Sequence, residues 1–381
     1  MKNEHSAPKN LLCFSHLRWD FVFQRPQHIL SRFAADVKVF FMEEPVFAAG
    51  QQPRLLTVKK SVGLTVLVPY INEGQSPQEV NATIEKLLAN FLLGAKLEDW
   101  TFWYYTPLAL QFSRHFKPAL TVFDCMDELS AFRYAPESLK MLEKELLAKA
   151  DVVFTGGYSL YVAKKTQHDN IWPVPSSIEK EHFMQARQDL AEPADQQCIE
   201  GFKIGFYGVI DERLDLDLIA AVANERPDWQ IILIGPVVKI DPATLPKAAN
   251  IHYLGQKKYA ELPAYLRGWD VAWLPFAINE STQFISPTKT PEYLAGGKPV
   301  VSSAIRDVAI PYGQKKLVSI AVNTSDFISE IERFAKIKDN SKWLEQVDLF
   351  LKDLSWDNTQ QFMADQMMLA MQQRSLISIA S

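Results

Sequence analysis

Cysteine, positive charge and long apolar runs are all scarce in this chain of 381 residues. Its three cysteines, Cys13, Cys125 and Cys198, have neither the spacing of a metal site nor the even number of a disulfide framework. With 40 Lys and Arg against 45 Asp and Glu, the formal net charge is -5, so no overall basic field attracts nucleic acid. We therefore expect a cytoplasmic protein that does not bind nucleic acid.

We also expect no segment that targets the chain for secretion or anchors it in a membrane. Residues 1–14, MKNEHSAPKNLLCF, lack the apolar core of a secretory signal. No run reaches the roughly 18 apolar residues of a membrane span. Any contact with the inner face of a membrane is therefore expected to be peripheral.

What the sequence does contain is an alternation of short apolar runs with amphipathic stretches. In the first half, predicted strands are 10–15, 37–42, 64–69, 102–105, 120–124 and 152–155, separated by helices at 24–34, 77–93, 108–116 and 136–148. In the second half, strands at 203–207, 230–234, 251–254, 271–275 and 299–302 alternate with helices at 215–224, 259–267 and 291–295. This alternation is typical of parallel sheets covered by helices on both faces.

The length of the chain and the repeated alternation of predicted strands and helices together predict more than one domain. We expect a first α/β domain over residues 1–185 and a second over residues 202–340, joined by the polar stretch 184–201. The tail 341–381 is expected to be helical, with a break near 355–357.

The most informative stretch is SPTKTPEYLAGGKPVV (286–301). It predicts a two-turn helix that Thr290 caps, that begins at Pro291 and that ends at Gly296 and Gly297. The helix would start at the carboxyl edge of the sheet, where its backbone N–H groups favour a phosphate.

Polar residues around this helix start are candidate nucleotide ligands. Lys289 adds a positive charge, Ser286 and Thr288 add hydroxyl donors, and Glu292 can accept from the two neighbouring hydroxyls of a ribose. The residues alone leave another interpretation open, in which Glu292 only complements the helix dipole and Lys289 is solvated.

The same stretch resembles the donor-binding signature of GT-B glycosyltransferases, especially the large retaining bacterial family (glycosyltransferase family 4/1-like). Glu292 and the run Gly297-Lys298-Pro299-Val300 match its recurring continuation. The resemblance implies a GT-B architecture, in which two Rossmann-like α/β/α domains face each other across a cleft. It also implies that the first domain binds the acceptor and the second the nucleotide-sugar donor, with Glu292 on the ribose. Retention at the anomeric carbon and the lack of any metal or cofactor are further implications, and no Asp-x-Asp pattern occurs in a metal-binding context.

Two more segments resemble the donor domain of this family. FYGVIDER (206–213) is similar to its opening strand, which ends in a glycine, here Gly208, and Arg213 matches an arginine that contacts the diphosphate. The lysine that often follows is absent, and we expect Lys289 to supply the missing charge. The alternative is that Arg213 pairs only with its acidic neighbours. In the segment 251–275, the loop with Gly255 and Gln256 is expected to lie beside the base.

The sequence departs from the family pattern at the position that contacts the sugar. Many members carry a Glu there, eight residues before the ribose-binding one, whereas this chain has Phe284. Glu280 is close but out of register. We therefore assign sugar recognition to Glu280 or to the loop backbone, and the identity of the sugar stays open.

The stretch SHLRWDFVFQRPQH (15–28) is the first candidate for the acceptor side. It lies between the first strand and the first helix, its aromatic and polar density suits a sugar, and it resembles a subgroup of cell-surface polysaccharide glycosyltransferases. The acceptor-binding candidates are His16, Arg18, Trp19 and Arg25. The structural alternative is that Trp19 and Phe23 pack over the sheet while Arg18 pairs with Asp20.

The run Asp124-Cys125-Met126-Asp127-Glu128 is the second candidate. Carboxylates at the end of a buried strand are costly unless they are solvated or used. Related enzymes carry a cleft-facing His or Asp here, so Asp127 is the expected catalytic carboxylate, followed by Asp124 and then His16. Asp124 is alternatively expected to cap the following turn.

Together these resemblances predict a glycosyltransferase that moves a hexose from a nucleoside-diphosphate sugar, expected to be UDP-linked, to a hydroxyl. The acceptor would be a carbohydrate or a lipid-linked sugar in polysaccharide or glycolipid synthesis of the cell envelope. Arg213 and Lys289 would stabilise the leaving diphosphate. The start of the last helix, SWDNT (355–359), resembles the family's closing helix, which returns to the first domain. Two alternatives remain: a nucleotide-sugar epimerase on the same fold, and a non-catalytic nucleotide-sugar-binding subunit.

Overall fold

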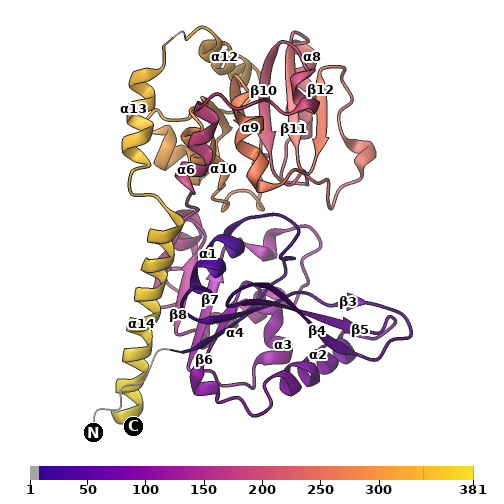
Figure 1. The fold of residues 1–381 in the computed structure, drawn as a ribbon, viewed down its shortest axis with the longest axis vertical. Coiled ribbons are helices and arrows are strands. Elements are labelled where there is room, and N and C mark those ends of the chain that lie inside the picture. The colour runs from indigo at the N-terminus through magenta and orange to yellow at the C-terminus, as the bar shows by residue number, and fades with distance from the viewer. Residues whose placement is uncertain (1–7, 338, 381) are drawn as a thin grey trace. The chain divides into compact units, whose positions relative to one another are not determined.

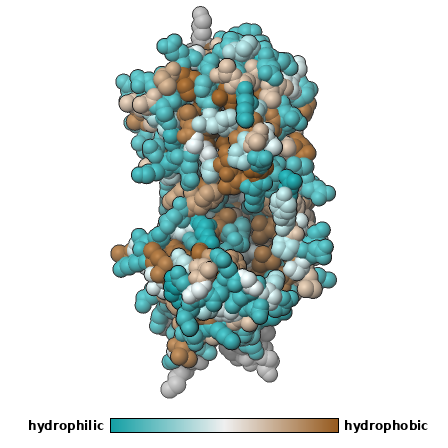
Figure 2. Space-filling view, turned by 90° about the vertical axis from the view of Figure 1, so that its right-hand side faces the viewer, coloured by the Kyte–Doolittle hydropathy of each residue, from teal (hydrophilic) through white to brown (hydrophobic). Residues whose placement is uncertain are grey.

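The computed structural model describes residues 8–337 and 339–380, with side chains up to residue 376. Contacts divide the chain into two compact units, Met1–Pro175 with Asp357–Ser381, and Ser176–Trp356 (Figure 1). Polar side chains cover most of the face of each unit that Figure 2 shows. The expectation about a secretory signal depends partly on residues 1–7, which lie outside the described residues.

The first unit is built on one largely parallel sheet with the strand order β3-β5-β2-β1-β6-β7-β8-β9. Its strands are β1 Asn10–Phe14, β2 Lys38–Met42, β3 Val46–Phe47, β4 Arg54–Ser61, β5 Leu64–Ile71, β6 Trp100–Tyr104, β7 Leu120–Cys125, β8 Val152–Thr155 and β9 Ile171–Pro173. Only β4 runs antiparallel to its neighbour, β5. The sequence analysis missed β4, because most of its side chains are exposed and no apolar face marks it as a strand.

Helices cover this sheet and bring the end of the chain back to it. They are α1 Arg25–Phe33, α2 Pro77–Phe91, α3 Leu110–Ser113, α4 Leu139–Lys149, α5 Tyr158–Lys164 and α14 Trp356–Ala380. Two ion pairs connect α14 to the first unit: Arg32 Nε to Asp357 Oδ1 at 2.7 Å, and Arg374 Nη1 to Asp151 Oδ2 at 2.9 Å.

The second unit is an all-parallel sheet with the strand order β12-β11-β10-β13-β14-β15. Its strands are β10 Phe202–Tyr207, β11 Trp229–Ile234, β12 Ile251–Gly255, β13 Val271–Leu274, β14 Val300–Ser303 and β15 Ser319–Ala321. The chain proceeds outward from β10 to β12 on one side and then restarts at β13 on the other. Open α/β sheets bind ligands at such a switch point, beyond the carboxyl ends of the strands.

Helices surround the second sheet as well. They are α6 Lys180–Met184, α7 Ala194–Gln197, α8 Leu216–Glu225, α9 Leu262–Arg267, α10 Lys289–Ala295, α11 Arg306–Val308, α12 Thr324–Ala335 and α13 Ser341–Phe350. The polar stretch 184–201 packs on this unit: Arg187 donates to Ala295 O at 2.6 Å, and the buried amide of Gln196 binds Tyr265 O at 2.9 Å.

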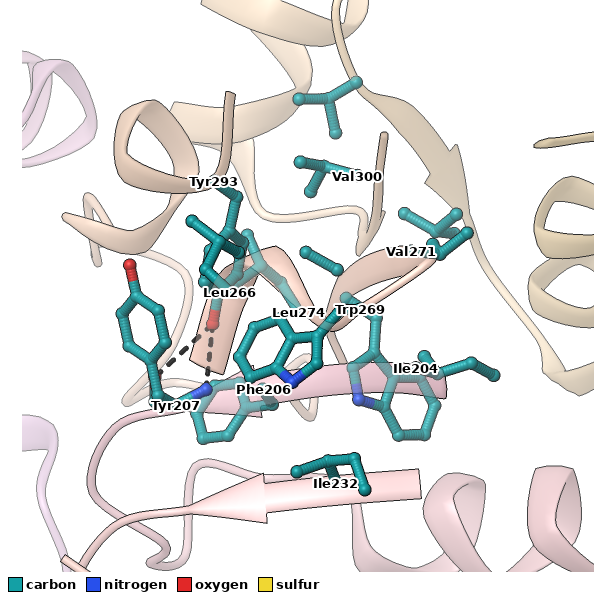
Figure 3. Close-up of a cluster of buried hydrophobic side chains, with 14 of the residues drawn as sticks. Ile204, Phe206, Tyr207, Ile232, Leu266, Trp269, Val271, Leu274, Tyr293 and Val300 are labelled. Carbon is teal, nitrogen blue, oxygen red and sulfur yellow. Dashed lines mark hydrogen bonds between the residues drawn. The ribbon is translucent and has the colours of Figure 1, made fainter. Parts of the chain in front are cut away.

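An aromatic cluster beneath α10 fixes the carboxyl half of β10 (Figure 3). The indole of Trp269 lies where a Cβ on Gly205 would overlap it, so only glycine fits at that position of β10. The Trp269 ring centroid lies 5.7 Å from that of Tyr207 and 5.8 Å from that of Tyr293. Each of these three side chains is at most 4% exposed. The end of β10 and the start of α10 are therefore packed against the same rigid core.

Candidate functional site

A glycine ends or directly follows each of three neighbouring strands of the second unit. Gly208, Gly235 and Gly255 have φ of 148°, 147° and 68°, a region that favours glycine. Gly208 N donates to Ile234 O at 2.8 Å, and Gly235 N donates to Gly255 O at 2.9 Å. A Cβ on Gly235 would overlap the carbonyl of Gly208. This edge therefore carries no side chain of its own at the three glycines, and open space remains beside Gly255. The sequence analysis named Gly208 and Gly255 but missed Gly235, which the Gly-Pro pair after the strand could have signalled.

Lys289 lies directly against this edge. It is the first residue of α10, and a Cβ on Gly208 would overlap its Cε. Its ammonium lies 5.9 Å from the ring centroid of Phe206. Because Gly208 has no side chain, the side chain of Lys289 fits beside it, although the two residues are far apart in the sequence. Lys289 thus brings a positive charge to the end of β10.

Glu292 is the buried carboxylate of the site, with 5% of its surface exposed. Its Oε2 accepts a hydrogen bond from the hydroxyl of Tyr207 at 2.8 Å. Burial raises the pKa of Glu292 to about 7, the Lys289 ammonium and the Tyr207 hydroxyl act in the opposite direction, and the charge of Glu179 adds to the rise. Sequence reasoning found Glu292 through its motif but overlooked Tyr207, the residue before the strand-ending glycine.

The start of α10 differs from the expectation. The helix begins at Lys289 rather than Pro291, and Thr288, not Thr290, occupies the cap position without a side-chain cap bond. Thr288 already has helical dihedral angles, φ -56° and ψ -30°, because the turn at Pro287 starts the helix two residues early. The predicted end is confirmed, since Gly297 has φ of 76° and its N–H donates to Leu294 O at 2.9 Å.

Arg213 makes the contact that the alternative interpretation expects. Its Nε and Nη2 bind the two carboxylate oxygens of Asp211, at 2.9 Å and 2.7 Å. Asp211 is buried, whereas the side chain of Arg213 remains 24% exposed. The pair braces the loop after β10, and Ala277 N donates to the carbonyl of Arg213 at 2.8 Å.

The remaining donor candidates lie on loops of the second unit. The carbonyl of Ser286 accepts from the hydroxyl of Ser176 at 2.5 Å, and Thr288 is half-buried beside it. Glu280 is exposed, in a turn whose neighbours are held by the side chain of Asn279. Gln256 is exposed after β12. Gly208, Lys289 and Glu292 are thus the predicted donor residues whose mutual contacts build a site.

In the first unit, Arg25 and Asp124 form a buried ion pair. Arg25 Nη2 lies 2.8 Å from Asp124 Oδ1, and Nε lies 3.1 Å from Oδ2. Arg25 Nη1 also donates to Val174 O at 2.7 Å. Burial raises the pKa of Asp124, and the guanidinium of Arg25 acts in the opposite direction. The expected turn cap at Asp124 is wrong, because its carboxylate instead fixes α1 to β7.

The expected pair of Arg18 with Asp20 is also wrong. Arg18 Nη1 binds Glu43 Oε2 at 2.9 Å, and Asp20 binds Lys60 instead. Glu43 also binds the backbone of the loop after β1, because its Oε1 accepts a hydrogen bond from Trp19 N at 2.7 Å. Arg18 and Asp20, two residues apart on one loop, thus bind different segments: the connection after β2 and strand β4.

Trp19 packs over the sheet as the structural alternative expects, with its ring centroid 5.0 Å from that of Phe41 on β2. His16 is half-buried just after β1. Asp127 is half-buried just after β7, where its carbonyl lies 3.6 Å from Cys125 Sγ and its charge raises the pKa of Arg25. These candidates therefore lie beyond the carboxyl ends of β1 and β7, the two strands that flank β6.

The loop that carries Asp127 is anchored by a second buried charge cluster. Lys164 Nζ, on α5, lies 2.7 Å from Glu128 Oε2 and 2.9 Å from Glu143 Oε1. Lys164 is 3% exposed, so both contacts are shielded from water. Asp127 thus lies next to two buried ion networks that hold its backbone.

The described residues contain neither a membrane-crossing helix nor a cluster of metal ligands. None of the described helices combines the length and apolarity of a membrane-crossing segment. Within residues 8–337 and 339–380, no group of three or more His, Cys, Asp or Glu side chains could hold a metal ion.

Sequence comparisons connect the chain to glycosyltransferases. Residues 202–336 match the family described as "Glycosyl transferases group 1", so the resemblance inferred from the donor motifs is confirmed for this domain. A protein of Bacillus subtilis (strain 168), the "Putative teichuronic acid biosynthesis glycosyltransferase TuaH", is 27% identical over 219 residues. That match covers 53% of this chain and 54% of the relative, so the chain spans about half the length of the curated relative it matches.

Solved structures confirm the predicted GT-B fold. A UDP-forming α,α-trehalose-phosphate synthase from Burkholderia xenovorans superposes with a TM-score of 0.70 at 12% identity, over 94% of this chain and 98% of that one. A trehalose-6-phosphate structure from E. coli bound with UDP-2-fluoro glucose gives 0.67 at 14% identity, over 94% and 98%. Sucrose-phosphate synthase from Thermosynechococcus elongatus gives 0.66 at 14%, over 98% and 100%. The fold is therefore α/β with two Rossmann-like domains.

Proposed function

We propose that this chain is a retaining glycosyltransferase that moves a hexose from a UDP-sugar to a hydroxyl of a carbohydrate or lipid-linked acceptor. The observation that carries the proposal is the contact of Gly208 with Lys289 beside the buried Glu292, within the segment that matches Glycosyl transferases group 1. The E. coli structural neighbour, bound with UDP-2-fluoro glucose, supports UDP as the nucleotide. The name of the B. subtilis relative supports polysaccharide synthesis.

Each group at the edge has a role in this reaction. The ribose hydroxyls donate to Glu292, and the diphosphate approaches the bare backbone at Gly208, where Lys289 neutralises its charge. Transfer breaks the bond between the anomeric carbon and the diphosphate oxygen, which keeps the electron pair. The acceptor oxygen bonds to the same carbon, and its proton leaves with the diphosphate. Because charge grows on the diphosphate during this step, Lys289 stabilises the transition state more than the bound donor.

The other predicted residues complete the proposal. Arg213 is the second cation for the diphosphate, Glu280 contacts the sugar, and Ser286 and Thr288 donate to the phosphates, with Gly255 and Gln256 beside the base. In the first unit, Asp127 orients the acceptor hydroxyl, and His16, Arg18, Trp19 and Arg25 belong to the acceptor region. The proposed chemistry uses no metal and no cofactor, so EDTA should leave the transfer rate unchanged.

The decisive experiment combines donor binding with turnover. UDP-, GDP-, ADP- and dTDP-sugars are first compared by thermal shift, where the UDP-sugar should raise the melting temperature most. Lys289→Ala should then lower kcat by about 100-fold. Arg213→Ala should lower it less, because Asp211 already engages its guanidinium. The double variant should lose less than the product of the two effects, since both cations act on one charge. A wild-type protein that no nucleotide sugar stabilises would contradict the proposal.

One observation favours a second function, that of a non-catalytic nucleotide-sugar-binding protein. The pairing of Arg213 with Asp211 engages the second cation, the lysine that often follows that arginine in related enzymes is absent, and Phe284 stands where many of them carry Glu. Such a protein would bind the UDP-sugar but release no UDP, with or without acceptor. Measurement of UDP release on the same samples separates the two functions.

A further inference from the structure

Tyr207 connects the end of β10 to the buried carboxylate of Glu292 through a hydrogen bond. It is the last residue of β10, directly before Gly208, and it is 4% exposed. Its hydroxyl donates to Glu292 Oε2 at 2.8 Å. A phenol that is buried this deeply needs a hydrogen-bond partner, and here the partner is the one carboxylate proposed to contact the ribose.

Packing fixes the direction of the Tyr207 hydroxyl. The ring centroid of Tyr207 lies 4.8 Å from that of Tyr293 and 6.2 Å from that of Phe183, to which it is nearly parallel at 16°. Its backbone N–H donates to the Tyr293 hydroxyl at 3.0 Å (Figure 3). Packing of the Tyr207 ring against the rings of Tyr293 and Phe183 directs its hydroxyl to Glu292, and this hydrogen bond constrains where Oε2 lies.

The groups around Glu292 come from three segments of the second unit. Tyr207 ends β10, Lys289 starts α10, and Glu179 precedes α6. Lys289 and Tyr207 favour the ionised carboxylate, whereas burial and Glu179 favour the neutral acid. An ionised carboxylate has about four acceptor positions, of which Tyr207 fills one. The hydrogen bond from Tyr207 goes to Oε2, and the remaining acceptor positions are those proposed for a diol.

We propose that Tyr207 is a positioning residue of the nucleotide-sugar site, which orients the Glu292 carboxylate and keeps it as an acceptor for the two ribose hydroxyls. This inference rests on the function proposed above. It has a consequence for pH: a protonated Glu292 donates where it should accept, so the affinity for donor should fall as pH falls through about 7, the pKa of Glu292. The diphosphate of a UDP-sugar has no group that titrates there, so the change reports on the protein.

Tyr207→Phe tests the proposal, because it removes only the hydroxyl and keeps the packed ring. We expect its affinity for UDP-glucose, measured by calorimetry from about pH 5.5 to pH 9, to fall about tenfold near pH 7. The midpoint of the pH dependence should move upward, since the lost hydrogen bond had favoured the ionised carboxylate. A purely structural role would not move that midpoint.

Tyr293→Phe is the matched control, because its hydroxyl binds the backbone of Tyr207 and not Glu292. It should keep the wild-type midpoint even if its melting temperature drops. A second comparison uses 2′-deoxy-UDP-glucose, which lacks one ribose hydroxyl. The wild type should prefer UDP-glucose to this analogue, and Tyr207→Phe should lose most of that preference.

The outcomes distinguish a failure of the role proposed for Tyr207 from a failure of the proposed function. If the wild type binds UDP-glucose but Tyr207→Phe keeps its midpoint and its preference for the ribose hydroxyl, Tyr207 is only a core residue and this inference is overturned. Equal shifts in Tyr207→Phe and Tyr293→Phe would overturn it as well. If the wild type binds no UDP-glucose at any pH, the proposed function fails, and the role of Tyr207 fails with it.

Discussion

The carboxylate of Glu292 is buried at a cost to the stability of the fold. Its pKa rises from an ordinary 4.5 to about 7. Below about pH 4 both folded and unfolded chains hold the proton, so the carboxyl costs nothing. As pH rises, the unfolded chain releases its proton first, and the free energy of unfolding falls. Above about pH 7 the loss levels off, on the order of 3 kcal/mol.

Glu292→Gln should therefore separate stability from binding. Without ligand, the variant should melt at a higher temperature than the wild type at about pH 8 and at the same temperature near pH 4. Its affinity for a UDP-sugar should drop by about 10- to 100-fold, because a hydrogen bond to a charged group is lost. Calorimetry and thermal melts on one preparation measure both effects. A variant that melts lower than the wild type at alkaline pH would contradict the buried charge.

At the scale of elements, the pair Arg25–Asp124 joins the first residue of α1 to β7 across 99 residues of sequence. Arg25→Leu leaves a buried carboxylate without its cation and should cost about 3–5 kcal/mol. The double variant Arg25→Leu with Asp124→Leu removes both charges and should regain most of that loss. Urea unfolding of the three proteins, followed by circular dichroism, measures the difference. A double variant as unstable as the single one would show that the pair contributes through its shape alone.

The ion pair between Arg25 and Asp124 also fixes the position of α1 relative to the loop after β7. The guanidinium of Arg25 also holds Val174 O, and Asp127 follows Asp124 by three residues. Loss of the pair should therefore disturb the proposed acceptor region as well as stability. Arg25 is consequently better described as a buried anchor of α1 and of the loop after β7 than as a surface contact.

At the scale of the whole molecule, the proposal assigns donor binding to the second unit and acceptor activation to the first. Asp127→Asn should then lower kcat by about 100-fold or more while donor affinity stays within about twofold of wild type. The reason is that a carboxylate that orients the acceptor acts mainly in the transition state. Transfer rate, donor affinity and melting temperature are measured on the same variant. Normal turnover with a lower melting temperature would show that Asp127 only supports its loop, and the role would pass to His16.

The α/β alternation, the parallel sheets and the donor motif could be predicted from the sequence, because each depends on the spacing of nearby residues. The sequence placed Lys289 and Glu292 at the start of one short helix for the same reason. It did not mark β4, whose residues are exposed, or the first turn of α10, where Pro287 starts the helix early.

Contacts between residues that are far apart in the sequence could be read only from the tertiary structure. Tyr207 reaches Glu292 across 85 residues, Lys289 fills the space that Gly208 leaves, and Arg25 reaches Asp124 across 99. Arg18 found Glu43 rather than Asp20. Such contacts follow from strand order and side-chain packing, which bring the carboxyl ends of separate strands to one edge. Local spacing carries no record of that order, because a hydrogen bond between strands depends on where the whole sheet places them.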